Sequence, residues 1–400
     1  MPGKEFGKYS GNNRVSLVPG GKPYFGHLIG LISGAESTVH LQTYIFAEDE
    51  TGQSVARALV GASQRGVAVF LMVDGYASQG LSRHFVQGLK AQGVKFRFFQ
   101  PLFRSKKFYL GRRLHHKVCV VDLRHALVGG INIANHYNEI QGSPPWLDFA
   151  LGVQGDIVRD LLVLCQKTWN GFQPLKKLPA IGHVPALPFA AADKSLVRMR
   201  RNDWVRGLDE VTLSYLELFR GAKSHITILS SYFLPGRVFR RALRNASRRG
   251  VEITLIVAGI SDVKIAKMAE RFMYDWLLAN GIKIFEYNRT VLHGKLAICD
   301  NDWITLGSFN VNDISTYASV ELNLDVKNPA FAREVGHYLE SRVVRHSTRV
   351  TGPYRAAHAH WAQRLVQWGA FATIRVLVYF FTFYFKRIVR TEGGGAERAT

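Results

Sequence analysis

Two residues in the second half of this sequence have types and a spacing suited to phosphate chemistry. His293 and Lys295 lie two positions apart in VLHGKLAICDNDWITLGSFN, residues 291–310. On a β-strand, side chains two positions apart point to the same face. The polar triplet at 300–302 is a turn candidate between two apolar runs. We therefore predict a β-hairpin that carries an imidazole and an ammonium group on one face.

The register of this hairpin decides which side chains meet. A two-residue loop at 301–302 would place Lys295 opposite Ser308 and His293 opposite Asn310. The set would then hold a nucleophile or acid, a point charge and two neutral hydrogen-bonding groups. Such groups together suit a phosphate.

The same pattern occurs earlier, in LHHKVCVVDLRHALVGGIN at 114–132. The residues that repeat at the same spacing are His115, Lys117, Asp122, Gly130 and Asn132, which match His293, Lys295, Asp300, Ser308 and Asn310. The same register would place Lys117 opposite Gly130. His115 is the member of the His115–His116 doublet that has a lysine two residues later. Because the pattern extends over so many residues, coincidence is a poor explanation.

Four carboxylates accompany the two hairpins. Asp148 and Glu321 each lie on the strand that follows a hairpin, at the same place in their repeat. We expect them to orient the histidines, because a carboxylate beside an imidazole selects its tautomer and stabilises its cation. Asp122 and Asp300 belong to the same motifs as the catalytic candidates but lie near the turns. We expect them to structure the turn or to pair with a basic group.

Strand and helix patterns alternate along the chain, which favours an α/β fold with a mixed sheet flanked by helices. Three later segments repeat earlier ones: 224–233 matches 37–46, 241–259 matches 57–75, and 281–287 matches 93–99. The chain is therefore predicted to be a tandem duplication, with halves related by a pseudo-two-fold axis and one active site between them. The expected division is 1–172, a Pro- and Ala-rich linker at 173–199, 200–345, and a tail at 346–400.

The doubled motif resembles the signature of the phospholipase D superfamily, and the first copy departs from it only at Gly130. Within the superfamily, the chain is most similar to bacterial cardiolipin synthases that lack N-terminal membrane spans. The segments that carry this similarity are 74–76, 232–236 and 292–295. The resemblance implies that one histidine attacks a phosphodiester and the other protonates the leaving alcohol. A second alcohol then resolves the phosphohistidine, with no metal and no cofactor.

Elementary electrostatics supports these roles. A phosphodiester carries negative charge that spreads over its oxygens in the transition state. Lys117 and Lys295 would neutralise that charge, while Asn132, Asn310 and Ser308 would donate hydrogen bonds. A neutral imidazole is a competent nucleophile near pH 7, and a protonated one is a competent acid.

The composition points to an anionic partner and to a membrane. The formal net charge is +22 over 400 residues. Residues 368–385 hold a single charge and are flanked by basic residues. We expect the helix of this tail to lie in or dip into the cytoplasmic leaflet of the cell membrane, so that the protein is peripheral or monotopic there; a true span and packing on the protein itself are the alternatives. An aromatic and basic loop at 98–113 suits a lipid interface and equally a nucleic-acid groove. No apolar leader is recognised, and the three cysteines are expected to be buried free thiols in a reducing compartment.

Cardiolipin synthesis from two phosphatidylglycerol molecules is therefore the expected activity, with phosphatidylglycerol and a membrane surface as partners. The alternatives are hydrolysis by water, transfer to another alcohol and, from a different class, cleavage of nucleic acid. The high positive charge would suit a nuclease. A soluble nuclease would have no use for residues 368–385, so no nucleic-acid partner is expected.

Overall fold

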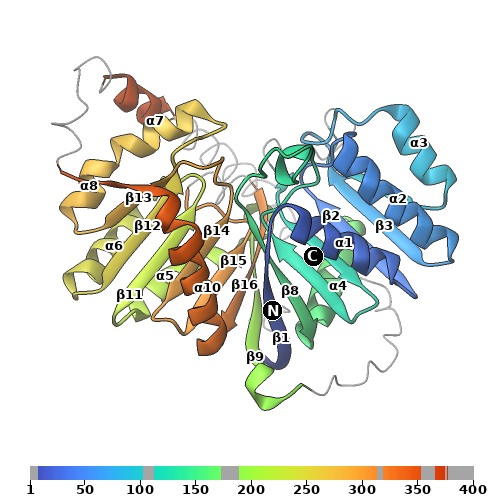
Figure 1. Ribbon diagram of the computed structural model, residues 1–400, viewed down its shortest axis with the longest axis horizontal. Coiled ribbons are helices and arrows are strands. Elements are labelled where there is room, and N and C mark those ends of the chain that lie inside the picture. Colours follow the sequence, from blue (N-terminus) through green and yellow to red (C-terminus); the bar gives the residue numbers. More distant parts are fainter. Residues whose placement is uncertain are drawn as a thin grey trace, which may run out of the picture.

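The computed structural model describes residues 8–101, 112–172, 189–312, 319–352, 365–373 and 376. Most of the predicted linker, most of the tail and residues 102–111 of the predicted basic loop lie outside the described residues. Two α/β halves lie side by side, the first in blue to green and the second in yellow to orange (Figure 1).

The first half alternates strands and helices as the sequence predicts. Its elements are β1 (Ser10–Pro19), α1 (Lys22–Ser33), β2 (Thr38–Thr43), α2 (Glu50–Gln64), β3 (Ala68–Asp74), α3 (Arg83–Ala91), β4 (Lys95–Phe99), β5 (Arg113–Leu114), β6 (Lys117–Val121), β7 (His125–Gly129), the 3-10 turn η1 (Asn135–Tyr137), β8 (Phe149–Gly155) and α4 (Ile157–Trp169). Local signals explain the boundaries of α2. Asp49 caps its first turn by accepting a hydrogen bond from the Gly52 amide, and Gly66 follows it at a φ of 91°.

The second half repeats this order. Its elements are β9 (Ser195–Asp203), β10 (Leu208–Asp209), α5 (Glu210–Gly221), β11 (His225–Ser230), α6 (Arg237–Arg248), β12 (Glu252–Ala258), α7 (Lys264–Phe272), α8 (Tyr274–Ala279), β13 (Lys283–Tyr287), β14 (Lys295–Cys299), β15 (Trp303–Gly307), β16 (Ser319–Lys327), α10 (Pro329–Arg342) and β17 (Ser347–Val350). Within each half, three parallel strands pair in sequence order, and the first of them pairs with the motif hairpin.

A continuous mixed sheet joins the halves. Its strands pair in the order β4, β3, β2, β6, β7, β8, β1, β9, β16, β15, β14, β11, β12, β13 and β17. Strands β8, β1, β9 and β16 therefore form the seam. One face of the seam is covered by α4 and α10, whose apolar side chains share a core drawn from both halves. A common core and sheet leave little freedom for one half to move against the other.

The predicted hairpin register is wrong by one residue in both copies. In the first hairpin Lys117 pairs with Gly129, whereas the sequence predicted Gly130. In the second, Leu296 pairs with Leu306. Continuing that register places the motif lysine opposite a glycine and not opposite Ser308.

The turn chemistry explains this shift. Asp300 and Asn301 both adopt the left-handed conformation, at φ values of 51° and 54°. Cys299 pairs with Trp303, and the amide of Asp302 donates to the Cys299 carbonyl, so the loop has three residues, 300–302, and not the predicted two at 301–302. The first hairpin has the same turn, with left-handed Asp122.

The motif aspartates bind backbone amides of the loops that precede β2 and β11. Asp122 accepts hydrogen bonds from the amides of residues 36, 37 and 38 at 2.7–2.8 Å. Asp300 accepts them from the amides of residues 223, 224 and 225 at 2.8–2.9 Å. Partial burial raises the pKa of Asp300, but these amides outweigh it and lower the pKa to about 2. Both aspartates therefore tie a hairpin turn to its neighbouring strand, which favours the structural role over contact with substrate.

Candidate active site

Each motif strand is held at the seam by a backbone carbonyl of the other half. The amides of His115 and His116 both donate to the carbonyl of Val320, at 3.0 Å. The amides of His293 and Gly294 donate to the carbonyl of Leu147, at 2.8 and 2.9 Å. These contacts bring two hairpins that are far apart in sequence to one place.

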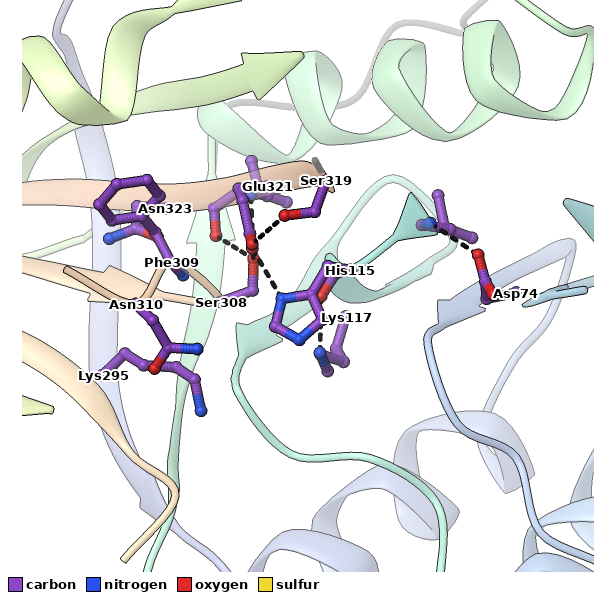
Figure 2. Close-up of polar contacts among 12 residues, drawn as sticks. Asp74, His115, Lys117, Lys295, Ser308, Phe309, Asn310, Ser319, Glu321 and Asn323 are labelled. Carbon is purple, nitrogen blue, oxygen red and sulfur yellow. Dashed lines mark hydrogen bonds and ion pairs between the residues drawn. The ribbon is translucent and has the colours of Figure 1, made fainter. Parts of the chain in front are cut away.

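The carboxylates pair with the histidines reciprocally across the halves. Nδ1 of His115 lies 2.9 Å from Oε2 of Glu321 (Figure 2). Nδ1 of His293 lies 2.6 Å from Oδ2 of Asp148. The sequence indicated both acids, but not that each binds the histidine of the opposite repeat.

These pairs define the state of the imidazole rings. Burial lowers the pKa of both histidines, to about 4 for His293. The nearby cation Lys295 and the bond from His293 hold the pKa of Asp148 low despite its burial. A carboxylate in its ionised form can only accept, so the Nδ1 atom carries the proton and Nε2 keeps its lone pair. Each ring therefore presents a basic nitrogen away from its carboxylate.

The two lysines are buried beside the rings. Nζ of Lys117 donates to the carbonyl of His115 at 2.6 Å, and Nζ of Lys295 donates to the carbonyl of His293. Nζ of Lys295 also lies 3.0 Å from Nδ1 of its histidine. Desolvation lowers the pKa of Lys117 to about 7 and that of Lys295 to about 8. An anion between them would restore their charge, so the pair is suited to bind a phosphate.

The departure of the first motif from the signature has a steric cause. A Cβ atom on Gly130 would lie 2.4 Å from Oδ1 of Asp148 and 2.7 Å from its Oδ2. The aspartate carboxylate therefore occupies the space that a serine side chain would need. In the second motif, Ser308 occupies the corresponding position and donates its hydroxyl to the longer Glu321.

Ser308 was predicted to donate to a phosphate, and the structure gives it a different partner. Its Oγ accepts from the Leu322 amide at 3.1 Å and donates to Oε2 of Glu321. Ser319 donates to the other oxygen of Glu321 at 2.7 Å. Two hydroxyls and His115 thus surround the carboxylate of Glu321 (Figure 2). Ser308 is therefore better placed to position this carboxylate than to contact substrate.

The two motif asparagines are also unequal. Oδ1 of Asn132 accepts from the Ile45 amide at 3.1 Å, and its Nδ2 donates to the Tyr137 hydroxyl at 2.8 Å. Oδ1 of Asn310 accepts from Ser231 at 2.6 Å. Figure 2 places the Asn310 amide beside Lys295, toward His115. Asn310 is therefore the better candidate for a direct phosphate contact.

Aromatic rings line both histidines, which the sequence motifs did not indicate. Tyr44 packs edge-on against His115, with ring centroids 4.9 Å apart. Tyr137 packs edge-on against His293 at 5.1 Å, and Trp146 lies 6.0 Å from the same ring. These rings exclude water, which strengthens electrostatic interactions in the site.

Two further side chains support the first motif. Oδ2 of Asp74 accepts from the Leu114 amide at 2.8 Å, directly before His115 (Figure 2). His116 is fully buried, and its Nε2 lies 2.8 Å from Oε1 of Gln42. His116 is thus a packed residue, as its missing lysine partner predicted. Within the described part of the chain, no group of three His, Cys, Asp or Glu residues is arranged to hold a metal ion.

Comparisons with known proteins agree with this geometry. Residues 28–141 and 215–343 match the family model described as cardiolipin synthase, PLD-like domain. Cardiolipin synthase B of Escherichia coli K12 is 32% identical over 80% of this chain and 78% of that protein. Cardiolipin synthase B of Salmonella typhi is 33% identical over 83% of this chain and 81% of that protein.

Solved structures share the fold at low sequence identity. A phosphatidylserine synthase from Haemophilus influenzae superposes with a TM-score of 0.67 and 14% identity, covering 96% of each chain. A polyphosphate kinase from Porphyromonas gingivalis superposes with a TM-score of 0.58 and 18% identity, covering 86% of this chain and 49% of that one. These likenesses bear on the fold alone.

Proposed function

Because the chain belongs to the cardiolipin synthase family of phospholipase D-like proteins, we propose that it transfers a phosphatidyl group from one phosphatidylglycerol to another and releases glycerol. The observation that carries this proposal is the reciprocal pairing of His115 with Glu321 and His293 with Asp148. It supplies two imidazoles with free Nε2 atoms beside two buried lysines. A phosphodiester between them would meet a nucleophile and an acid together.

The reaction proceeds in two balanced steps. An anionic phosphodiester bound between the rings favours the protonated form of one imidazole. The other imidazole attacks the phosphorus of the donor through Nε2, the bond to the glycerol oxygen breaks, and the protonated imidazole gives its proton to that oxygen. A hydroxyl of the second phosphatidylglycerol then gives its proton to this neutral imidazole and attacks the phosphohistidine. Lys117, Lys295 and Asn310 stabilise the charge on the phosphoryl oxygens in both steps.

Two other acceptors use the same chemistry. Water as the second nucleophile would release phosphatidic acid, and another alcohol would give a different phosphatidyl ester. Cleavage of nucleic acid is disfavoured because the relatives that match most of this chain in sequence are cardiolipin synthases.

The test is turnover of phosphatidylglycerol labelled in its acyl chains by the purified full-length chain. We expect cardiolipin and glycerol in equal amounts, and loss of at least about 10³-fold in His115→Ala and His293→Ala. His337→Ala, at an exposed position of α10, is the matched control and should keep wild-type turnover. Phosphatidic acid as the sole product, or cardiolipin formation by either active-site variant, would refute the proposal.

We propose further that the protein associates peripherally with the cytoplasmic face of the membrane. Ile260, Val263 and Ile265 are 40–47% exposed in and beside the loop before α7. Residues 365–373 form a helix that packs Phe371 on Phe272 of α7, with a centroid distance of 5.0 Å. Such apolar side chains beside a strongly basic chain suit an anionic lipid surface.

Among the described residues, no helix is long and apolar enough to cross a bilayer. The predicted membrane segment at 368–385 lies mostly outside them. Sedimentation with vesicles tests the association: binding should require anionic lipid and weaken as salt rises from 0.1 to about 0.5 M. Equal binding to neutral vesicles would refute the electrostatic part of the proposal.

A further inference from the structure

The loop between β12 and α7, in the second half, contains a carboxylate that has no part in the phosphoryl transfer described above. Asp262 lies in the loop between β12 and α7 and is exposed. The hydroxyl of Tyr232 donates to its Oδ1. Among the ion pairs of the described residues, Asp262 takes part in none. Its carboxylate does not cap the N-terminus of α7 either, because that helix has no side-chain cap.

Strand pairing places this Tyr232–Asp262 pair next to the reacting groups. Ser230, two residues before Tyr232, lies directly opposite Lys295 in the β11–β14 ladder. The intervening Ser231 donates to Asn310 at 2.6 Å. Tyr232 therefore lies two residues beyond the end of β11, the strand that pairs with Lys295.

Asp262 also acts electrostatically on groups of both halves. Its charge acts on Lys295 and, from the other side, on His136 and Tyr137 of η1. Tyr137 is the ring that packs edge-on against His293. The carboxylate is therefore close enough to act electrostatically on Lys295 and on the ring that packs on His293.

A negative charge at this place needs a physical reason. It repels the phosphate of a bound phosphodiester, and the other two carboxylates that act on Lys295, Asp148 and Glu321, are each bonded to a histidine. A carboxylate is, however, a strong acceptor for hydroxyl donors, and the Tyr232 oxygen has acceptor capacity left beside it. Together they can bind the hydroxyl of a vicinal diol that does not attack, while the other hydroxyl gives its proton to the imidazole.

We propose that Asp262 and Tyr232 bind the hydroxyl of the polyol acceptor that does not attack, and thereby select a glycerol headgroup over water and simple alcohols. The inference rests on the proposed transferase function and names the residues that choose its acceptor. A site that hydrogen-bonds a hydroxyl discriminates against an acceptor that lacks it, because its polar groups are then left unpaired. For bonds to a charged group, this amounts to roughly 10- to 100-fold.

The test measures how one phosphohistidine intermediate divides among competing acceptors. Labelled phosphatidylglycerol is turned over with equal concentrations of 1,2-propanediol and 1-propanol in water, and the two phosphatidyl esters and phosphatidic acid are quantified. The product ratio does not depend on how fast the intermediate forms. We expect the wild type to favour the diol over 1-propanol by roughly 10- to 100-fold, and Asp262→Asn and Tyr232→Phe to reduce that ratio at least about fivefold.

Control variants and outcomes separate this inference from the proposed function. Glu340→Gln, at an exposed position of α10, should keep the wild-type ratio. A parallel fall of all three products in Asp262→Asn, with the ratio unchanged, would overturn the inference alone. It would indicate that Asp262 acts by raising the pKa of Lys295. Phosphatidic acid as the only wild-type product would overturn both. A diol preference that Asp262→Asn abolishes, in a wild type that makes no cardiolipin, would support the inference and overturn the cardiolipin assignment.

Discussion

Replacing Gly130 by serine would complete the first motif, yet the structure predicts that it damages the enzyme. The new Cβ atom would lie 2.4 Å from Oδ1 and 2.9 Å from Cγ of Asp148. Ordinary van der Waals contact begins near 3.4 Å. The carboxylate must therefore move by about 1 Å, and both partners lie in a well-packed seam.

The magnitude follows from the bond that this movement breaks. Asp148 holds Nδ1 of His293 at 2.6 Å, and about 1 Å more separation exceeds hydrogen-bond distance. A misplacement of this size at a catalytic group costs roughly 10²-fold in rate. Overpacking should also lower the free energy of unfolding by about 1–3 kcal/mol.

The assay is kcat for phosphatidylglycerol turnover together with thermal unfolding followed by circular dichroism. Gly88→Ser is the matched control, because a Cβ at Gly88 on α3 meets no atom within 4 Å. Adding Asp148→Glu to Gly130→Ser copies the Ser308–Glu321 arrangement and should restore part of the activity. Wild-type kcat and stability in Gly130→Ser would refute the reasoning, since the carboxylate could not then occupy that space.

Further predictions concern the motif aspartate and the lysines. Asp300→Ala removes three amide contacts and should lower the free energy of unfolding by about 1–2 kcal/mol, measured by urea denaturation at pH 7. The value is modest because the site is open to solvent. Asp302→Ala is the control. Since the folded-state pKa of Asp300 is depressed to about 2, this stabilisation is present above pH 4 and is lost as pH falls through about 2, so equal effects at pH 7 and 2 would contradict it. Binding of dimethyl phosphate at pH 7.5 should take up protons, because an anion raises the pKa of Lys117 from about 7 and of Lys295 from about 8. Calorimetry in buffers of different ionisation enthalpy measures the uptake, which should shrink at pH 6 and in Lys295→Met; uptake that is independent of pH would argue against buried lysines of lowered pKa.

Local patterns in the sequence were sufficient for the repeat, the element types and the motif residues. Strand and helix periodicity depends on neighbouring side chains, so α2, β3 and their copies α6 and β12 could be located from it. The paired spacing of His115 and Lys117 with His293 and Lys295 indicated phosphate chemistry for the same reason. The turns were harder, because two consecutive left-handed residues plus a third loop residue have no unique sequence signal.

The partners of the histidines were decided by the tertiary structure. Asp148 binds His293 and Glu321 binds His115 because the two halves share one sheet seam, and pairing across a seam leaves no trace in local spacing. The same contact explains Gly130, whose missing side chain makes room for a carboxylate from the next strand. The sequence by itself determined which chemical groups are present, and packing between the repeats determined which of them touch, since that depends on shapes brought together from distant parts of the chain.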